Sequence, residues 1–167
     1  TGIGNAIVDV IVNVEDKYLE DQDIRKGMMS LVDLKTIENI SDTIEIRTTV
    51  SGGSVANSIV ALAQNGVNTA FIGKVGNDEI GLKFIDGLEG ENVTFACKAQ
   101  NDDSKSGRCI VMVTPDAQRT MSTYLGISQK LNSGDINKDV ITNSSITYLE
   151  GYLWDLDDAQ VAIKHAT

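Results

Sequence analysis

Two polar residues inside an apolar stretch near the start of the chain could carry out chemistry. Asn5 and Asp9 lie within residues 2–14, which are otherwise rich in Ile and Val and are typical of a β-strand. Side chains four residues apart in an extended strand point to the same side. An amide beside a carboxylate can bind vicinal hydroxyl groups, because the carboxylate accepts two hydrogen bonds. The alternative is that Asp9 caps a neighbouring loop.

A glycine pair between a predicted strand and a predicted helix forms a second candidate site. Gly52 and Gly53 are followed by Ser54, and Asn57 projects from the first turn of the helix. Glycine lets the backbone approach a ligand closely, and the free N–H groups of a first helical turn point toward the same place. These neutral donors and acceptors suit hydroxyl groups. A tight turn in which Asn57 bonds to local backbone explains the same residues equally well.

Glu150 is a third candidate, because it directly follows an apolar strand predicted at residues 146–149. Ligands of open α/β sheets gather at the carboxyl ends of the strands. Two other glycine-rich stretches are not phosphate-binding loops. In residues 2–7 the third glycine of a dinucleotide fingerprint is replaced by Ile7, and in residues 66–75 Val75 stands where a P-loop needs Ser or Thr.

The elements that must position these residues alternate between strands and helices. Further strands are expected at residues 28–32, 43–50, 67–75, 93–98, 107–113 and 120–125, and helices at residues 16–22, 33–40, 55–65, 78–88 and 157–166. Asp33 is the predicted N-cap of the helix at residues 33–40. This alternation predicts an α/β fold with parallel strand pairs. Residues 43–50 alternate polar and apolar side chains, and residues 107–125 form a hairpin around Pro115. Both suggest a small, partly exposed β layer beside the main sheet, which could cover a site as a lid.

Composition narrows the classes of protein. The 167 residues are 41% hydrophobic and 23% charged, which is ordinary for a soluble globular domain. The net charge of −10 argues against nucleic acid and anionic membrane as partners. No apolar run is long enough to span a bilayer. Cys97 and Cys109 match no zinc pattern and are expected to be reduced thiols of a cytoplasmic protein.

Five segments, taken in order, resemble the phosphofructokinase-B (ribokinase-like) family of carbohydrate kinases. They are GNAIVDV, SGGSVANSIVALAQNG, FIGKVGNDEIG, VTPDAQRTMSTYLG and YLEGYLWD. The VTPDAQRTMSTYLG segment is most similar to the bacterial adenosine kinase-like branch. The resemblance covers essentially all 167 residues and is to the N-terminal portion of the family's domain. It implies a Rossmann-type central sheet flanked by helices, with lid strands at roughly 11–14, 28–32, 43–50 and 107–125.

The resemblance also implies roles for individual residues. It assigns sugar-hydroxyl binding to the residues already singled out, namely Asn5, Asp9, Gly52, Gly53, Ser54, Asn57 and Glu150. Arg119 and Met121 fall in the hairpin that corresponds to part of the lid, and residues 73–78 correspond to a structural strand-to-helix turn.

The implied activity is ATP- and Mg²⁺-dependent phosphoryl transfer to a hydroxymethyl group. Adenosine is the first-choice acceptor, and a sugar such as ribose or fructose is the second. The family's Asp-Thr-x-Gly-Ala-Gly-Asp loop, which supplies the anion hole and the catalytic base, appears nowhere in the 167 residues. We therefore expect no catalytic residue here and an inactive fragment if the chain stands alone. The competing class is a non-catalytic sugar- or nucleoside-binding module. The exposed lid strands could also pair two subunits into a homodimer.

Overall fold

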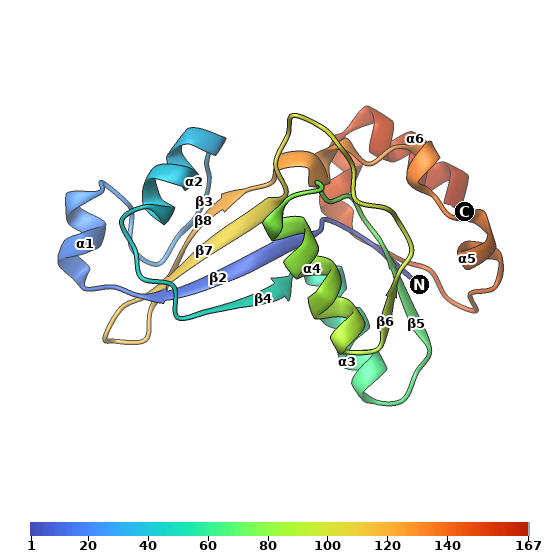
Figure 1. Ribbon diagram of the computed structural model, residues 1–167, viewed down its shortest axis with the longest axis horizontal. Coiled ribbons are helices and arrows are strands. Elements are labelled where there is room, and N and C mark those ends of the chain that lie inside the picture. Colours follow the sequence, from blue (N-terminus) through green and yellow to red (C-terminus); the bar gives the residue numbers. More distant parts are fainter. Residues whose placement is uncertain (167) are drawn as a thin grey trace.

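The computed structural model describes residues 1–166, apart from the side chain of His165, and folds them around two β-sheets. In Figure 1 the long strands β2 and β7 extend to the left, where α1 and α2 lie, while β5, β6, α5 and α6 lie to the right. The first sheet has four strands in the order β6-β5-β1-β9, and the second has five in the order β3-β8-β7-β2-β4.

The four-stranded sheet is parallel throughout. Its strands are β1 (Gly2–Ile3), β5 (Thr69–Ile72), β6 (Val93–Phe95) and β9 (Tyr148–Leu149). The helices α3 (Ser54–Gln64) and α4 (Glu79–Gly90) bring their buried side chains to one core, and α6 (Asp157–Ala166) brings its own to another. Phe71 belongs to the first core and its neighbours Ile3 and Ile72 to the second. The sheet is therefore covered on both faces, as parallel sheets are.

The five-stranded sheet is mixed and has one covered face. Its strands are β2 (Ile7–Asn13), β3 (Met29–Leu31), β4 (Thr48–Gly52), β7 (Gly107–Val113) and β8 (Arg119–Tyr124). Strands β7 and β8 form an antiparallel pair, and β2 lies parallel to β7 and antiparallel to β4. Along β2 the residues Val8, Val10 and Val12 are buried in the main core, while Ile7 and Asp9 point to the other face. The predicted β layer beside the main sheet is confirmed.

Side-chain caps mark where several of the helices begin. The remaining helices are α1 (Asp16–Asp21), α2 (Leu34–Ser41) and α5 (Lys138–Thr142), and three 3₁₀ turns lie at η1 (Gly126–Lys130), η2 (Ser133–Asp135) and η3 (Gly151–Asp155). Asp33 Oδ1 accepts the backbone N–H of Thr36 at 2.8 Å at the start of α2, and Asp78 Oδ1 accepts that of Gly81 at 2.8 Å at the start of α4. The predicted N-cap at Asp33 is confirmed.

Two strand predictions need correction. Residues 2–14 form two strands in two different sheets, because the chain leaves the four-stranded sheet after Ile3 and enters the other at Ile7. Asn5 consequently lies in the connection and not in a strand. The strand predicted at residues 43–50 begins only at Thr48, which pairs with Ile11. Continuing that antiparallel register places residue 46 opposite Asn13, where β2 ends, so earlier residues have no partner strand.

The other sequence-level predictions concern the membrane and the cysteines. Within residues 1–166 no helix combines the length and the apolar character that crossing a membrane requires. Cys97 and Cys109 are both free thiols. Burial raises the pKa of each thiol to about 11, so both are uncharged near neutral pH.

Candidate functional site

A cavity of about 500 Å³ brings together most of the predicted site residues. Asn5 follows the carboxyl end of β1, and Glu150 follows that of β9. Gly53 and Ser54 lie where α3 begins, and Asp9 projects from β2. All five line the cavity, which therefore has a polar end built from both sheets. The remaining wall is largely apolar.

Glu150 is the centre of a hydrogen-bond network at the polar end. Its Oε2 accepts the backbone N–H of Asn5 at 2.6 Å and the side-chain amide N–H of the same residue at 2.8 Å. Its Oε1 accepts the hydroxyl of Ser54. These three donors replace water around a carboxylate that is only 6% exposed. Glu150 thereby joins three segments that are far apart in the sequence.

Asn5 is held by this network from both ends of its amide. The Nδ2 atom donates to Glu150, and Oδ1 lies 3.1 Å from the hydroxyl of Ser128 in η1, whose single proton is shared with the Leu125 carbonyl at 2.6 Å. A primary amide has two N–H groups and two lone pairs on oxygen, so one of each is left for a ligand. The side chain is thus fixed in orientation while retaining the capacity to bind.

Asp9 has a different environment. Its carboxylate has no hydrogen-bond donor within the described chain, residues 1–166, and burial raises its pKa. Cys109 lies beside it on β7, and Thr123 follows on β8. The hydroxyl of Thr123 lies 3.2 Å from the thiol of Cys109. A half-buried carboxylate to which no described residue donates is suited to accept hydrogen bonds from hydroxyl groups of a ligand.

The glycine turn makes room for these groups. A Cβ atom on Gly52 would lie 2.6 Å from Asp9 Cγ, and one on Gly53 would lie 2.6 Å from the backbone oxygen of Asn5. Gly53 also has a φ of +99°, which residues with a side chain rarely adopt. Unlike α2 and α4, helix α3 begins without a side-chain cap. Its first N–H groups lie at the polar end of the cavity and are available to an acceptor.

One face of the five-stranded sheet supplies most of the apolar wall. Side chains from four of its strands line the cavity, and Leu125, Tyr152 and Leu156 lie opposite or beside them. The strand residues are Ile7, Met29, Leu31, Cys109 and Met121. Met29 and Leu31 are 52% and 62% exposed, so this face is open on the side away from the core.

Three predicted residues lie outside the cavity lining. Asn57 is exposed on the first turn of α3, and its backbone N–H donates to the carbonyl of Gly53 at 3.0 Å. Gly52 lies behind the Asp9 carboxylate. Arg119 begins β8 and shares the face of Met121, but it lies beyond the lining residues.

Sequence reasoning missed several residues of the site. Ser128 and Gln129 belong to η1, which has no recognisable motif, yet Ser128 contacts Asn5 and Gln129 lines the cavity. The available signal was a serine within the segment LGISQKL, where Ile127 and Leu131 are fully buried. Tyr152 and Asp155 line the cavity from η3, inside a segment that drew attention only for Glu150.

The described residues do not form a metal centre. Across residues 1–166, leaving aside the side chain of His165, no three His, Cys, Asp or Glu side chains come together as ligands. The part of the chain that the structure describes therefore contains no ligand set of its own for Mg²⁺.

Comparison with known proteins identifies the class. The pfkB family carbohydrate kinase profile matches residues 28–167, and the chain belongs to this family. A crystal structure of adenosine kinase from Sinorhizobium meliloti is 37% identical and superposes with a TM-score of 0.87 over 99% of this chain. A probable sugar kinase from Rhizobium etli is 34% identical, also with a TM-score of 0.87 over 99% of this chain. The two sheets and their helices are thus the ribokinase-like α/β fold.

The relatives are longer than the chain. It covers 50% of the Sinorhizobium meliloti structure and 50% of the Rhizobium etli structure. A bifunctional ribokinase/ribose-5-phosphate isomerase A from Fructilactobacillus sanfranciscensis is 24% identical over 147 residues, which are 85% of this chain and 24% of the relative. The chain therefore spans about half the length of the solved structures and about a quarter of that curated relative.

Proposed function

We propose that this chain forms the acceptor-binding part of an ATP- and Mg²⁺-dependent kinase that phosphorylates a hydroxymethyl group of a nucleoside, with adenosine as the first choice. The observation that carries the proposal is the division of the cavity into a polar end and an apolar wall. A ribose would occupy the polar end, and a base would lie on the apolar wall.

The polar end supports a specific division of labour. Asp9, with its open acceptor sites, receives hydrogen bonds from vicinal ribose hydroxyls. Asn5, held by Glu150 and Ser128, offers one donor and one acceptor to the same sugar. The uncapped start of α3 at Gly53 and Ser54 adds backbone donors, with Asn57 on the outer side of the same turn. Orienting the acceptor in this way is the principal contribution of these residues, because phosphoryl transfer depends on positioning and charge stabilisation.

The apolar wall favours a nucleoside over a free sugar. Met29, Leu31, Met121 and Leu156 present hydrocarbon and thioether surface to the cavity, and Tyr152 presents a ring. A pentose alone has little apolar surface to cover these side chains. A purine ring has two flat faces, and either face can pack against them. The adenosine kinase of Sinorhizobium meliloti, with 37% identity, is in line with this choice. Ribose and fructose remain the alternative acceptors.

Calorimetry with adenosine, ribose and fructose tests the choice of acceptor. We expect adenosine to bind at least about tenfold more tightly than either sugar, because covering one apolar side chain is worth roughly 1.5–3 kcal/mol. The full-length protein should then convert adenosine and ATP to AMP and ADP in the presence of Mg²⁺. Tighter binding of ribose or fructose would move the assignment to a sugar kinase, and saturable binding of none of the three would reject the site.

A non-catalytic binding module is the second candidate. It requires only the cavity and the hydrogen-bond network around Glu150, both of which lie within residues 1–166. We assign no catalytic base to this chain, and ATP and Mg²⁺ would be held mostly by residues outside it. Binding of adenosine without phosphate transfer by the full-length protein would favour the module.

A homodimer through the five-stranded sheet is the partner we propose. Strands β3 and β4 lie at the two edges of this sheet, and their side chains Leu31 and Val50 are 62% and 46% exposed. Pairing across such edges would cover both the backbone groups and the apolar side chains. Light scattering on the full-length protein should give twice the monomer mass, and a monomer at all concentrations would contradict the proposal.

A further inference from the structure

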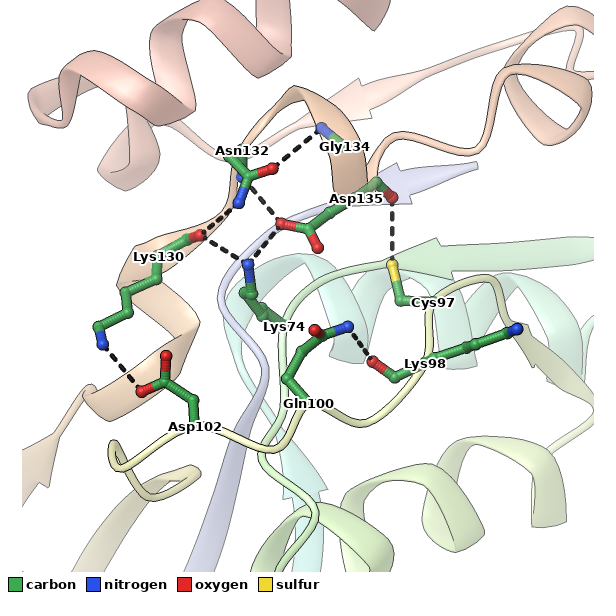
Figure 2. A network of polar contacts seen from close by, with 9 residues as sticks. All are labelled: Lys74, Cys97, Lys98, Gln100, Asp102, Lys130, Asn132, Gly134 and Asp135. Atoms are coloured by element: carbon green, nitrogen blue, oxygen red, sulfur yellow. Dashed lines mark hydrogen bonds and ion pairs between the residues drawn. The ribbon is translucent and has the colours of Figure 1, made fainter.

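A largely buried ion pair joins the end of β5 to a turn that lies outside the cavity. Lys74 Nζ lies 2.9 Å from Asp135 Oδ2, and only 11% and 10% of the two side chains are exposed. The same ammonium group donates to the backbone oxygen of Lys130 at 3.1 Å. Figure 2 shows the Lys74 side chain pointing toward the turn from Lys130 to Asp135, so one cation holds both ends of that turn.

Asp135 also shapes the turn from within. Its Oδ2 accepts the backbone N–H of Asn132 at 2.9 Å, and Asn132 Oδ1 accepts the N–H of Gly134 at 2.9 Å. The backbone oxygen of Asp135 accepts the thiol of Cys97 at 3.4 Å, as Figure 2 also shows. The bonds that the side chains of Asn132 and Asp135 accept form a capping box, which fixes the path of this short turn. Lys74 therefore binds to a preformed unit and not to a loose loop.

The turn continues directly into the wall of the cavity. Lys130 is the last residue of η1, in which Gln129 lines the cavity and Ser128 lies 3.1 Å from Asn5 Oδ1. Ile127 and Leu131, on either side of these residues, are fully buried. A shift of the Lys130 carbonyl would therefore move the two residues that precede it. The hydroxyl of Ser128, which also bonds to the Leu125 carbonyl within the same turn, contacts the Asn5 amide oxygen on the side opposite Glu150.

A second lysine shows that this arrangement is specific. Lys83 and Glu79 form an ion pair of 2.8 Å one turn apart on α4, with side chains that are 45% and 81% exposed. Such exposed pairs contribute little and fix no distant segment. Lys74 and Asp135 lie 61 residues apart and are withdrawn from water, which is the setting in which a charged pair specifies geometry.

We propose that Lys74 and Asp135 are positioning residues for acceptor binding. By holding the turn of residues 130–135 they keep η1 in place, and η1 keeps Ser128 against Asn5. The inference rests on the proposed function, because Asn5 is taken there as a ligand of the acceptor. Neither Lys74 nor Asp135 lines the cavity, so both act through Ser128 and Asn5.

The test compares Lys74→Met and Asp135→Asn with Lys83→Met as the matched control, all in the full-length protein. We expect the first two to raise the dissociation constant of adenosine about 5–20-fold, within the range of coupling between groups of one network. Lys83→Met should change it less than about twofold, as expected for an exposed pair. In a Ser128→Ala background, Lys74→Met should add less than about twofold, because the path to Asn5 is already broken.

Hydrogen exchange gives a readout that needs no ligand. The N–H of Ile127 donates to the carbonyl of Lys105 at 3.0 Å, and that of Ser128 to Leu125 at 3.2 Å. Lys74→Met should speed exchange at both positions about tenfold or more, since one network holds η1, while Lys83→Met leaves them unchanged. If a single variant fails to fold, the double variant Lys74→Met/Asp135→Asn, which buries no unpaired charge, replaces it in both measurements.

The outcomes separate this inference from the proposed function. If adenosine binds and Lys74→Met weakens it no more than Lys83→Met does, the pair is only structural and the inference is wrong. Equal effects of Lys74→Met with and without Ser128 overturn it as well. If the unmodified protein binds no adenosine, the proposed function fails, while unchanged exchange at Ile127 and Ser128 in Lys74→Met would still overturn the positioning role.

Discussion

The carboxyl end of the parallel sheet and the open face of the five-stranded sheet each contribute one carboxylate to the cavity. The two carboxylates differ in their burial and in their hydrogen-bond partners. Glu150, at the end of β9, is 6% exposed, and both of its oxygens accept hydrogen bonds from Asn5 and Ser54. Asp9, on β2, is half-buried, and none of the donors in residues 1–166 reaches its carboxylate. The first carboxylate organises the polar end of the cavity, and the second has no donor among the described residues, which is why we propose that it binds the ligand.

Because of this difference, we expect Glu150 to contribute mainly to the stability of the fold and Asp9 mainly to ligand affinity. A buried acceptor that already holds three donors contributes to folding, because its loss leaves those donors unpaired. A desolvated carboxylate without partners costs stability and is retained for what it binds. Substitutions at the two positions should therefore give distinct patterns of unfolding and affinity.

The largest effect is expected from Asp9→Asn on affinity. Loss of two charge-assisted hydrogen bonds, each worth about 1.5–3 kcal/mol, should weaken adenosine binding at least about 100-fold. The free energy of unfolding should stay the same or rise, because a poorly solvated charge is removed. Calorimetry and urea unfolding measure the two quantities, with the exposed Asp42→Asn as control. Unchanged affinity would remove Asp9 from the site.

Glu150→Gln should change both quantities. An amide nitrogen would face one of the donors that the carboxylate now accepts, so we expect the free energy of unfolding to fall by about 2–3 kcal/mol. Affinity should fall about tenfold as Asn5 loses its fixed orientation, on the scale of about 1.4 kcal/mol. Urea unfolding beside the exposed control Glu89→Gln checks the first effect. An unchanged free energy of unfolding together with lost affinity would mean that Glu150 binds adenosine directly, and its role would then not differ from the one proposed for Asp9.

Gly53→Ala sharpens the comparison at the turn between the two sheets. The new Cβ would lie 2.6 Å from the backbone oxygen of Asn5, at a φ of +99°. Gly66→Ala is the matched control, because its φ is +82° but its Cβ would meet open space. We expect the free energy of unfolding to fall by roughly 1 kcal/mol in the control and by about 2–3 kcal/mol in Gly53→Ala, as measured by urea unfolding. Equal losses would show that the close approach to Asn5 is relaxed easily.

The smallest effect is a pH dependence of stability. Burial raises the pKa of Asp9 in the folded state above its ordinary value of 3.8. Between these two values the folded protein holds more protons than the unfolded one, so the contribution of Asp9 falls as the pH rises through this window. Hydrogen bonds from Lys130 and Lys26 lower the pKa of Asp102 and Asp116 to about 2, which acts in the opposite direction.

Subtracting the pH profile of Asp9→Asn from that of the unmodified protein isolates the contribution of Asp9. The difference should favour the unmodified protein most at the acidic end of the window and should decline toward neutral pH. Thermal unfolding between about pH 3 and 7 measures it, across the usual range of carboxyl titration. A difference that grows with pH would mean that Asp9 has a partner in the folded state.

Local patterns predicted much of the fold. Three local features could be predicted because each depends on residues close together in the sequence: the cap at Asp33, the turn at Gly52 and Gly53, and the hairpin around Pro115. The residues that gather at the polar end of the cavity were predicted through side chains of unusual type for their surroundings, such as Asp9 among β-branched neighbours. Ser128 was not predicted, because a serine in a short 3₁₀ turn belongs to no distinguishing sequence pattern.

The sequence by itself determined the alternation of strands and helices and the polar residue types at the candidate site, since periodicity, capping and glycine conformation act over a few residues. The tertiary structure decided which of them meet. The bonds between Asn5 and Glu150 span 145 residues, and the contact between Asn5 and Ser128 spans 123. The pairing of β1 with β9 and the contact of Ser128 with Asn5 made Glu150 a structural centre, whereas Asp9, on β2 of the other sheet, has no donor among the described residues.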